Sequence, residues 1–581
     1  MKTKSDKMDS KKHVLSDVPT HHKPLRLWPG VVIVVLQWLV WFVIPIVIPG
    51  ALAVGVFGGL LGGLAIIVWW AFFSRAPRIE RWGAIVVMIV AMVATSFIID
   101  KSIATAQIGL TFVIYGIPIL SLAFVLWAVI TSRISDKLRR VTMVVTILFA
   151  CGFWTLLRTE GMTSDFGHDF VWRWTETPEE RLLTQPGNEL TALPSDSVVT
   201  ETVADWPGFR GPDRDGIIRD VEIETDWSAS PPVELWRRPI GPGLSSFAIH
   251  GDLLYTQEQR GDEEVVSCYN LTTGMPVWKH SDAARFLGAD ANPGPRATPT
   301  LNNGRVYTFG ATGILNVLDA GDGTIVWSRN AASEADVKVP VWGFASSPLV
   351  VEEVVIVQVA DKIVAYDLVT GNPRWFGPVG SGYSSPHLLT IDSVEQILLL
   401  SGVGATSFAP ADGTVLWEHP WPESDRILQP ALISDGDLLI SAILNSIQHI
   451  EVSHGPVGWT IEERWTSTRM KPNFNDLVIH KGHAYGFDGQ NLACIDLEDG
   501  ERKWKSRRYG GQLILLAEQD MLLVLTEKGE LALVAAIPDQ FTELARFPAI
   551  EGKTWNHPVL VGDLLIVRNS QEMAAFRLSP R

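Results

Sequence analysis

Arginine, aromatic, amide and imidazole side chains stand directly before short apolar runs at several places in the last two-thirds of the sequence. Arg296 occurs in Gly294-Pro295-Arg296-Ala297-Thr298-Pro299, and Trp342 precedes Gly343-Phe344-Ala345-Ser346. An arginine can hold a carboxylate through two parallel hydrogen bonds, and a histidine can donate a hydrogen bond or titrate near neutral pH. An aromatic ring can stack on a planar ligand. The residues that could form such a ligand site are Arg260, Arg296, Trp342, Tyr383, His387, Asn475, Asp476, Asn556 and His557.

These side chains can form one site only if the loops that carry them meet in the fold. If they meet, we expect the site to bind an anionic small molecule or a segment of a partner protein, without turnover. The competing interpretation is structural, because polar residues in such positions commonly bond to one another and to trapped water.

Common catalytic and metal-binding motifs are absent from the sequence. It contains no G-x-x-x-x-G-K-[ST], no H-E-x-x-H, no C-x-x-C and no G-x-S-x-G. Three cysteines are too few for a disulfide framework. No catalytic residue and no metal ligand set can therefore be assigned from motifs.

The element that would position the candidate residues is indicated by eight aromatic residues that recur every 39 to 49 positions. This period is the length of one four-stranded propeller blade. The spacing therefore predicts an all-β, eight-bladed propeller. The repeated aromatic residues are Trp236, Trp278, Trp327, Trp375, Trp417, Trp465, Trp504 and Phe547.

Five of these tryptophans follow a glycine by four residues, after a stretch with the apolar alternation of a strand. The glycines are Gly274, Gly323, Gly371, Gly413 and Gly500. Each can supply a positive φ angle in a tight turn, and the tryptophan then lies on the next strand. We expect its large ring to pack between neighbouring blades.

A second repeat, out of phase with the first, marks the expected start of the innermost strand of each blade. Examples are Ser346-Ser347-Pro348 and Ser384-Ser385-Pro386, each followed by a short apolar run. Small residues fit there because inner strands converge on a narrow central channel. The candidate ligand residues flank these starts, so we expect them at the mouth of the channel.

The segment Ala365-Tyr366-Asp367-Leu368-Val369-Thr370-Gly371, followed by Trp375, resembles the signature of the pyrroloquinoline-quinone (PQQ) repeat family. The resemblance covers residues 205–581, and its opening Asp205-Trp206-Pro207-Gly208-Phe209-Arg210-Gly211-Pro212 looks like the start of many uncharacterised PQQ-like propellers. It implies an eight-bladed propeller. Family members include quinoprotein dehydrogenases and the non-enzymatic outer-membrane assembly factor BamB, so the resemblance leaves activity open.

The N-terminal part of the sequence indicates five membrane-spanning helices, because each of five apolar runs has about the 20 residues needed to cross a bilayer. The predicted organisation is a basic tail at 1–26, a five-helix membrane domain at 27–157, a polar linker at 158–204 and the propeller at 205–581. The apolar runs are Leu27 to Ile48, Ala51 to Phe73, Trp82 to Ile99, Ile108 to Ile130, and Val141 to Leu157.

Basic residues are concentrated in the N-terminal tail and in the second and fourth loops between the runs. This pattern predicts a cytoplasmic N terminus, and five crossings then place the propeller on the periplasmic side of the inner membrane. Residues 1–160 hold 16 basic and 7 acidic residues, a net charge of +9, and the remainder carries −25. An acidic outer domain argues against nucleic acid as a partner.

Two functions fit this organisation. The propeller is a binding or scaffolding module held at the bilayer, with a protein partner or an anionic small molecule at its mouth. Alternatively, it is a membrane-bound quinoprotein dehydrogenase that uses PQQ and Ca²⁺, as its resemblance to five-span glucose dehydrogenases implies. The sequence favours the first, because no adjacent cysteines, no haem motif and no recognisable catalytic carboxylate occur in it.

Overall fold

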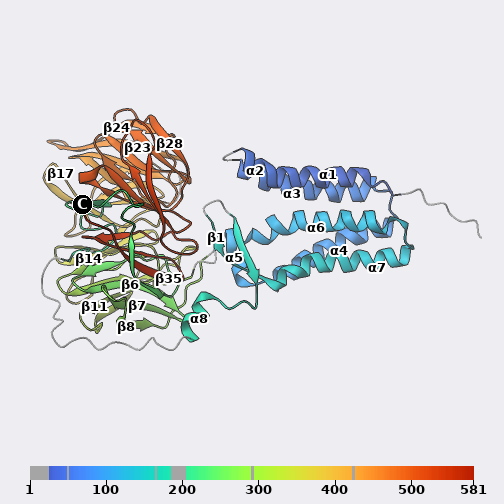
Figure 1. Ribbon diagram of the computed structural model, residues 1–581, viewed down its shortest axis with the longest axis horizontal. Coiled ribbons are helices and arrows are strands. Elements are labelled where there is room, and N and C mark those ends of the chain that lie inside the picture. Colours follow the sequence, from blue (N-terminus) through green and yellow to red (C-terminus); the bar gives the residue numbers. More distant parts are fainter. Residues whose placement is uncertain (1–24, 49–50, 164–166, 185–203, 289–292, 422–425) are drawn as a thin grey trace, which may run out of the picture. The chain divides into compact units, whose positions relative to one another are not determined.

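The computed structural model describes residues 25–48, 51–163, 167–184, 204–288, 293–421 and 426–581 (Figure 1). The chain divides into two compact units, residues 1–104 with 109–158 and residues 105–108 with 159–581. The predicted basic tail lies outside the described residues except for its last two positions.

The first unit is helical, and its described residues include five helices long and apolar enough to cross a membrane. Those candidate spans are Trp28–Val47, Leu52–Phe73, Arg78–Ser96, Thr111–Arg133 and Asp136–Leu156. Two of them contain π-helical turns, at Leu39–Val43 and Trp69–Phe73. The individual helices are α1 (Trp28–Trp38), α2 (Ile44–Val47), α3 (Leu52–Val68), α4 (Arg78–Ser96), α5 (Lys101–Gly109), α6 (Thr111–Ile130) and α7 (Asp136–Gly152), with α5 broken by non-helical backbone near its end.

Small residues on α3 let the neighbouring helices approach closely. A Cβ atom at Gly63 would lie 2.2 Å from Cγ2 of Ile117 on α6, so only glycine fits there. The buried Gln37 on α1 donates a hydrogen bond of 2.7 Å from Nε2 to the carbonyl oxygen of Gly59. Close packing and this polar contact hold α1, α3 and α6 together.

A buried ion cluster joins α4 to α7. Helix α4 begins at Arg78, before the predicted start at Trp82, so Glu80 lies in its first turn. The Glu80 carboxylate is fully buried and accepts hydrogen bonds of 2.8 and 3.1 Å from Arg139 and of 3.2 Å from Arg140. Its negative charge is also favoured by its position at a helix N-terminus.

The interval 158–204, predicted as a polar linker, contains folded elements among its described residues. Strands β1 (Leu157–Met162) and β2 (His168–Trp172) form a two-stranded sheet. Helix α8 (Pro178–Thr184) begins with a capping box, in which Thr177 and Glu180 exchange side chain to backbone hydrogen bonds of 3.0 and 2.7 Å. Glu179 pairs with Arg285, which fastens α8 to the propeller.

Eight antiparallel sheets form the propeller, which confirms the predicted fold class. The first four blades are β5 (Ala248–His250) to β8 (Pro276–Asp282), β9 (Thr300–Asn302) to β12 (Ile325–Asn330), β13 (Leu349–Val351) to β16 (Pro373–Pro378), and β17 (His387–Ile391) to β20 (Val415–Pro420). The last four are β21 (Ala431–Ser434) to β24 (Gly458–Ser467), β25 (Val478–His480) to β28 (Arg502–Arg508), β29 (Gln512–Leu516) to β32 (Glu543–Pro548), and β33 (Val559–Val561) to β35 (Glu572–Arg577) with β4 (Val233–Pro239). In Figure 1 the blades run from green through yellow to red.

Besides β35, fifteen strands occupy the middle positions of the eight blades. They are β6 (Leu253–Arg260), β7 (Glu263–Asn270), β10 (Arg305–Phe309), β11 (Ile314–Asp319), β14 (Val354–Val359), β15 (Lys362–Asp367), β18 (Val394–Ser401), β19 (Gly404–Phe408), β22 (Asp437–Ala442), β23 (Ser446–Gly455), β26 (His483–Asp488), β27 (Asn491–Asp496), β30 (Met521–Leu525), β31 (Glu530–Ala535) and β34 (Leu564–Arg568). A further strand, β3 (Ile217–Ile218), pairs in parallel with β29, and a one-turn helix α9 (Ala331–Glu334) follows β12.

The ring is closed by β4, which precedes the first blade in sequence but pairs with β35 as the outer strand of the eighth. Arg568 reinforces this seam, because its fully buried guanidinium donates to Oγ1 of Thr256 at 2.7 Å and to the carbonyl of Gly241 at 2.9 Å. Strands from both ends of the propeller sequence therefore share one blade.

The predicted packing of tryptophans between blades is confirmed for most repeats. Trp375 is 7% exposed, and a Cβ atom on Gly413 of the next blade would lie 2.4 Å from its ring. Its Nε1 donates a hydrogen bond of 3.0 Å to the carbonyl of Pro410 in the same turn. Equivalent ring-to-turn hydrogen bonds are made by Trp236, Trp278, Trp327, Trp465 and Trp504.

Two repeats depart from this rule. Trp417 donates instead to Oε1 of Gln396 in its own blade, at 2.6 Å. The next blade offers no glycine turn there, because β23 and β24 extend to ten residues each. Phe547 has no polar atom to donate and makes an edge contact with Phe576, at 5.5 Å between ring centroids.

Candidate functional site

Hydrogen bonds join neighbouring blades around the central channel at the start of the inner strands, and we call this region the neck. The Ser246 amide donates to Oγ1 of Thr298 at 3.1 Å, and the Thr298 amide donates to Oγ of Ser347 at 3.0 Å. The chain of contacts continues from Ser347 to Ser385 and from Gln429 to Asp476. These contacts link the first four blades in order and the fifth blade to the sixth.

Loops that lead into the inner strands form one end of the channel, which we call the mouth. Five of these loops carry a half-buried aromatic ring. Two of the rings belong to residues predicted from the sequence, and three were not predicted. The five mouth aromatics are Trp342, Tyr383, Trp421, Phe474 and Trp555.

Three of the predicted residues meet at the mouth. The ring centroids of Trp342 and Tyr383 lie 5.3 Å apart. Nε of Arg296 donates a hydrogen bond of 2.6 Å to the carbonyl of Trp342, and its guanidinium lies 4.7 Å from the centre of the Phe286 ring. Cationic groups also cover two further mouth aromatics, since Arg426 lies over Trp421 and Lys553 over Trp555.

Arg260 is held away from this group by a buried carboxylate. Its Nη2 lies 3.0 Å from Oε1 of Glu258 and 3.0 Å from the Tyr269 hydroxyl. Burial alone would raise the pKa of Glu258, but the Arg260 charge and three hydrogen bonds lower it to about 2. The arginine therefore neutralises a buried acid of its own blade.

Beyond the neck, residues 205–218 cross the channel, and we call this segment the plug. Trp206 pairs with Ile249 in the first blade, and β3 adds to the seventh. Arg210 and Arg214 both have positive φ angles, of 61° and 55°. Such backbone is uncommon for non-glycine residues and persists only where surrounding contacts impose it.

The two plug arginines meet the second group of predicted residues. Nη2 of Arg210 donates to the carbonyl of Leu477 at 2.6 Å, and its Nη1 lies 3.7 Å from the Asp476 carboxylate. Nε2 of His557 lies 3.6 Å from the same carboxylate. Arg214 donates to the carbonyls of Ser347 and Pro348, directly before the inner strand of the third blade, at 3.1 and 2.9 Å.

The electrostatics of this group follow from burial. Burial and the positive charges of Arg214 and Arg210 lower the pKa of His387 to about 3. Burial also lowers the pKa of His557 to about 4. The negative charge of Asp476 opposes this shift, and the positive charge of Arg210 adds to it. Both imidazoles are therefore neutral at pH 7.

The two predicted asparagines support the backbone around the neck. Nδ2 of Asn556 donates to the carbonyl of Ser245 at 2.8 Å and to that of Gly243 at 3.2 Å, and Asn475 donates to the carbonyl of Gly511. The structure thus divides the nine predicted residues into three groups. The mouth group is Arg296, Trp342 and Tyr383, and the plug group is His387, Asp476 and His557. Arg260, Asn475 and Asn556 are bonded to neighbouring parts of the propeller. The structure adds Arg210 and Arg214, which motif spacing could not identify.

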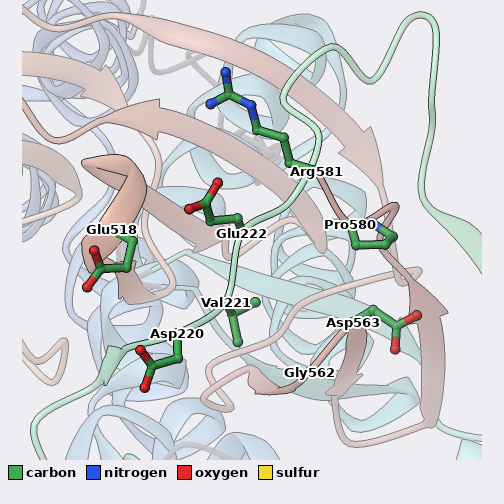
Figure 2. Close-up of a pocket in the computed structure, with 8 residues that line it drawn as sticks. All are labelled: Asp220, Val221, Glu222, Glu518, Gly562, Asp563, Pro580 and Arg581. Atoms are coloured by element: carbon green, nitrogen blue, oxygen red, sulfur yellow. The ribbon is translucent and has the colours of Figure 1, made fainter.

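A separate pocket lies among the turns between inner and second strands, at the opposite end of the sheets from the mouth. It has a volume of about 600 Å³ and is lined by Asp220, Val221, Glu222, Glu518, Gly562, Asp563, Pro580 and Arg581. Figure 2 shows the four carboxylates spread around it. Among the described residues, no three His, Cys, Asp or Glu side chains are placed to hold a metal ion.

Comparison with known proteins agrees with this architecture. A family model described as "Outer membrane protein assembly factor BamB" matches residues 224–388 and 345–537. The outer membrane protein assembly factor BamB of Yersinia pestis is 21% identical over 330 residues, which cover 54% of this chain and 72% of that protein.

Two solved structures are similar to this chain, and the first of them supports the fold. The quinohemoprotein alcohol dehydrogenase of Comamonas testosteroni has a TM-score of 0.50 at 13% identity, covering 66% of this chain and 82% of that one. BamB of Moraxella catarrhalis has a TM-score of 0.32 at 15% identity, covering 58% and 84%. The repeat tryptophans, the eight closed blades and the match over more than half of the sequence show that the chain belongs to the PQQ-repeat β-propeller family described as outer membrane protein assembly factor BamB.

Proposed function

We propose that this protein is a membrane-anchored propeller whose mouth binds a segment of a partner protein without turnover. The observation that carries the proposal is the set of five half-buried aromatic rings contributed by five different mouth loops. Arginine and aromatic residues dominate the binding energy of protein interfaces, because they supply large apolar area with a polar or charged tip.

The mouth loops can act together because the blades beneath them form a closed ring. Trp342 and Tyr383 are already in contact, so little side-chain ordering remains to be done on binding. Similarity to an assembly factor supports a protein partner rather than a reaction. Similarity to a quinohemoprotein dehydrogenase extends to the fold alone.

Photo-crosslinking in intact membranes tests the mouth. With p-benzoylphenylalanine at Tyr383, we expect a discrete adduct that is reduced about tenfold or more by Trp342→Ala, since interface hot spots contribute at least 2 kcal/mol each. The same photoprobe at Val457, which is 93% exposed on a hairpin tip, is the control and should give no discrete adduct.

A different outcome would overturn the non-enzymatic assignment. The purified full chain, incubated with PQQ and Ca²⁺, is assayed for reduction of an artificial electron acceptor. PQQ-dependent reduction that Arg296→Ala abolishes would make the protein a quinoprotein dehydrogenase instead. Absence of reduction together with a mouth-specific adduct supports the binding function.

The proposal includes an orientation, with the N terminus in the cytoplasm and the propeller on the extracytoplasmic side of the inner membrane. Its support is the distribution of basic residues, since Arg75 lies between the second and third spans and Arg78 and Arg81 lie at the start of the third. Arg133 is the last residue of the fourth span, and Lys137 is the second residue of the fifth. Loops rich in arginine and lysine remain in the cytoplasm.

Cysteine labelling of intact cells checks this orientation. A thiol introduced by Val457→Cys should react with an impermeant maleimide before lysis, and a thiol introduced by Ser132→Cys only after lysis. The native thiols Cys151, Cys268 and Cys494 are buried, so background labelling is low. Labelling in the reverse order would contradict the orientation.

A further inference from the structure

Glu264 is a buried acid at the contact between the first and second blades, and it is 4% exposed. Its Oε2 accepts a hydrogen bond of 3.0 Å from Oγ1 of Thr312, and its Oε1 has no hydrogen-bond partner in the described parts of the chain. Glu258, the other buried acid of the first blade, is paired with Arg260, whereas Glu264 forms no ion pair among the described residues. An ionised carboxylate is costly in such a place, because the interior does not replace its lost hydration.

A second carboxylate lies on the neighbouring strand. Asp282 on β8 stands directly opposite Glu264, and the Cβ atoms of such pairs are about 4.5–5.5 Å apart. Asp282 accepts a hydrogen bond of 2.6 Å from Asn316 of the second blade and lies 3.4 Å from Nε2 of His280. Asp282 and His280 are the titratable side chains on this face of β8. On its other side Glu264 is opposed by Gln259 of β6, which does not titrate.

Binding a proton removes the unbalanced charge of this acid. Burial raises the pKa of Glu264 from its ordinary value of 4.5 to about 7, and the charge of Asp282 adds to the shift. Hydrogen bonds from the Thr312 hydroxyl and from the amides of Ala311 and Thr312 oppose it. Because the pKa is higher in the folded chain, folding takes up a proton. The resulting stabilisation is complete below pH 4.5 and is lost as the pH rises through about 7.

The same acid touches a turn that supports the mouth. Residues 310–313 join β10 to β11, and a Cβ atom on Gly310 would collide with Oε2 of Glu264. In this turn the carbonyl of Ala311 accepts a hydrogen bond of 3.0 Å from the amide of Phe344. Phe344 follows Trp342 by two residues in a mouth loop. A change of charge at Glu264 therefore acts on the turn to which this mouth loop is bonded.

We propose that Glu264 is a proton-operated latch between the first two blades. When protonated it holds the turn at residues 310–313, and when ionised it loosens that turn and the mouth loop bonded to it. The physical reason is that ionisation places two carboxylates on neighbouring strands at a buried contact between blades. Only the consequence of this latch for partner binding rests on the function proposed above, and the measurements that test the latch use no partner.

Urea unfolding of the full chain in detergent, at pH 5 and at pH 8, tests the proton linkage. Glu264→Gln imitates the protonated acid at both pH values, and Glu263→Gln is the matched control because Glu263 is the exposed neighbour on the same strand. From pH 5 to pH 8 the unfolding equilibrium constant of the wild type should rise at least about tenfold more than that of Glu264→Gln. Glu263→Gln should behave as the wild type does.

Hydrogen exchange of the Phe344 amide distinguishes a latch from a general loss of stability. Exchange rates are corrected for the intrinsic effect of pH on amide exchange. We expect protection of this amide in the wild type to fall at least about tenfold between pH 5 and pH 8, because its acceptor lies in the turn that the latch holds. Protection in Glu264→Gln should be the same at both pH values, and Glu263→Gln should show the wild-type fall.

Two results would overturn the proposal. One is an equal pH dependence of unfolding in the wild type and in Glu264→Gln, and the other is a fall in Phe344 protection that Glu264→Gln also shows. If Glu264→Gln fails to fold, as judged by its circular dichroism, Thr312→Val decides the question. This variant removes the hydroxyl that favours the ionised acid, so the pH dependence of unfolding should move to higher pH. No such movement would then count against the latch.

Discussion

Trp375→Ala is expected to lower the free energy of unfolding of the propeller by about 3–5 kcal/mol, the usual cost of removing a large buried aromatic ring. The ring is 7% exposed, stacks on Phe408 with centroids 6.3 Å apart, and covers the turn at Gly413 of the next blade. Alanine would leave a cavity between two blades and an unpaired carbonyl at Pro410. Urea unfolding of the full chain, followed by circular dichroism, measures the change.

Trp174→Ala is the matched control for this measurement. Trp174 lies outside the blades and is 69% exposed, with its ring stacked on Trp172. Surface substitutions usually change stability by about 0.5 kcal/mol or less, so we expect little effect. Equal effects of the two substitutions would show that packing between blades does not depend on the repeat tryptophans.

Glu80→Ala is expected to destabilise the helical unit by about 3–5 kcal/mol, because it leaves a buried guanidinium without its partner. The Glu80 carboxylate is fully buried and the Arg139 side chain is 8% exposed. Asp136 lies 3.2 Å from Arg139 and remains in the variant, which places the effect toward the lower end of this range. Thermal unfolding of the helical signal in detergent provides the measurement.

A double variant separates the lost ion pair from other effects. Glu80→Ala with Arg139→Met should recover much of the stability lost in Glu80→Ala, since no buried charge is then left unpaired. Lys137→Met, on the exposed side of the same helix turn, should be nearly neutral. A double variant less stable than Glu80→Ala would mean that Arg139 contributes through packing rather than charge.

The architecture of the propeller could be predicted because its determinants are local. A glycine with positive φ and a tryptophan four residues later fix one turn and one strand, and this pair recurs in five of the eight blades. The fifth blade shows the limit of such patterns. Its outer hairpin runs ten residues on each side to a tip at Gly455 and Gly458, and Trp417 consequently bonds within its own blade.

The candidate site was only partly predictable. Trp342 and Tyr383 could be found because they precede recognisable inner strands. Arg210 and Arg214 could not be assigned a role, because their partners lie 267 and 134 residues away and no periodicity connects them. Arg260 was expected at the mouth, but it bonds to Glu258, and the burial of that carboxylate depends on the packing of a whole blade.

The pairing of β4 with β35 has a consequence for biosynthesis. Strand β4 ends at Pro239 and its partner begins at Glu572. Strand β4 therefore cannot form its hydrogen bonds until the last strand of the propeller has been synthesised. At synthesis rates of about 5–20 residues per second, the delay is on the order of tens of seconds. Throughout that time β4 presents an unpaired edge, which is the kind of surface that recruits another strand. Premature termination before β35 would make this exposure permanent and produce a chain prone to aggregation.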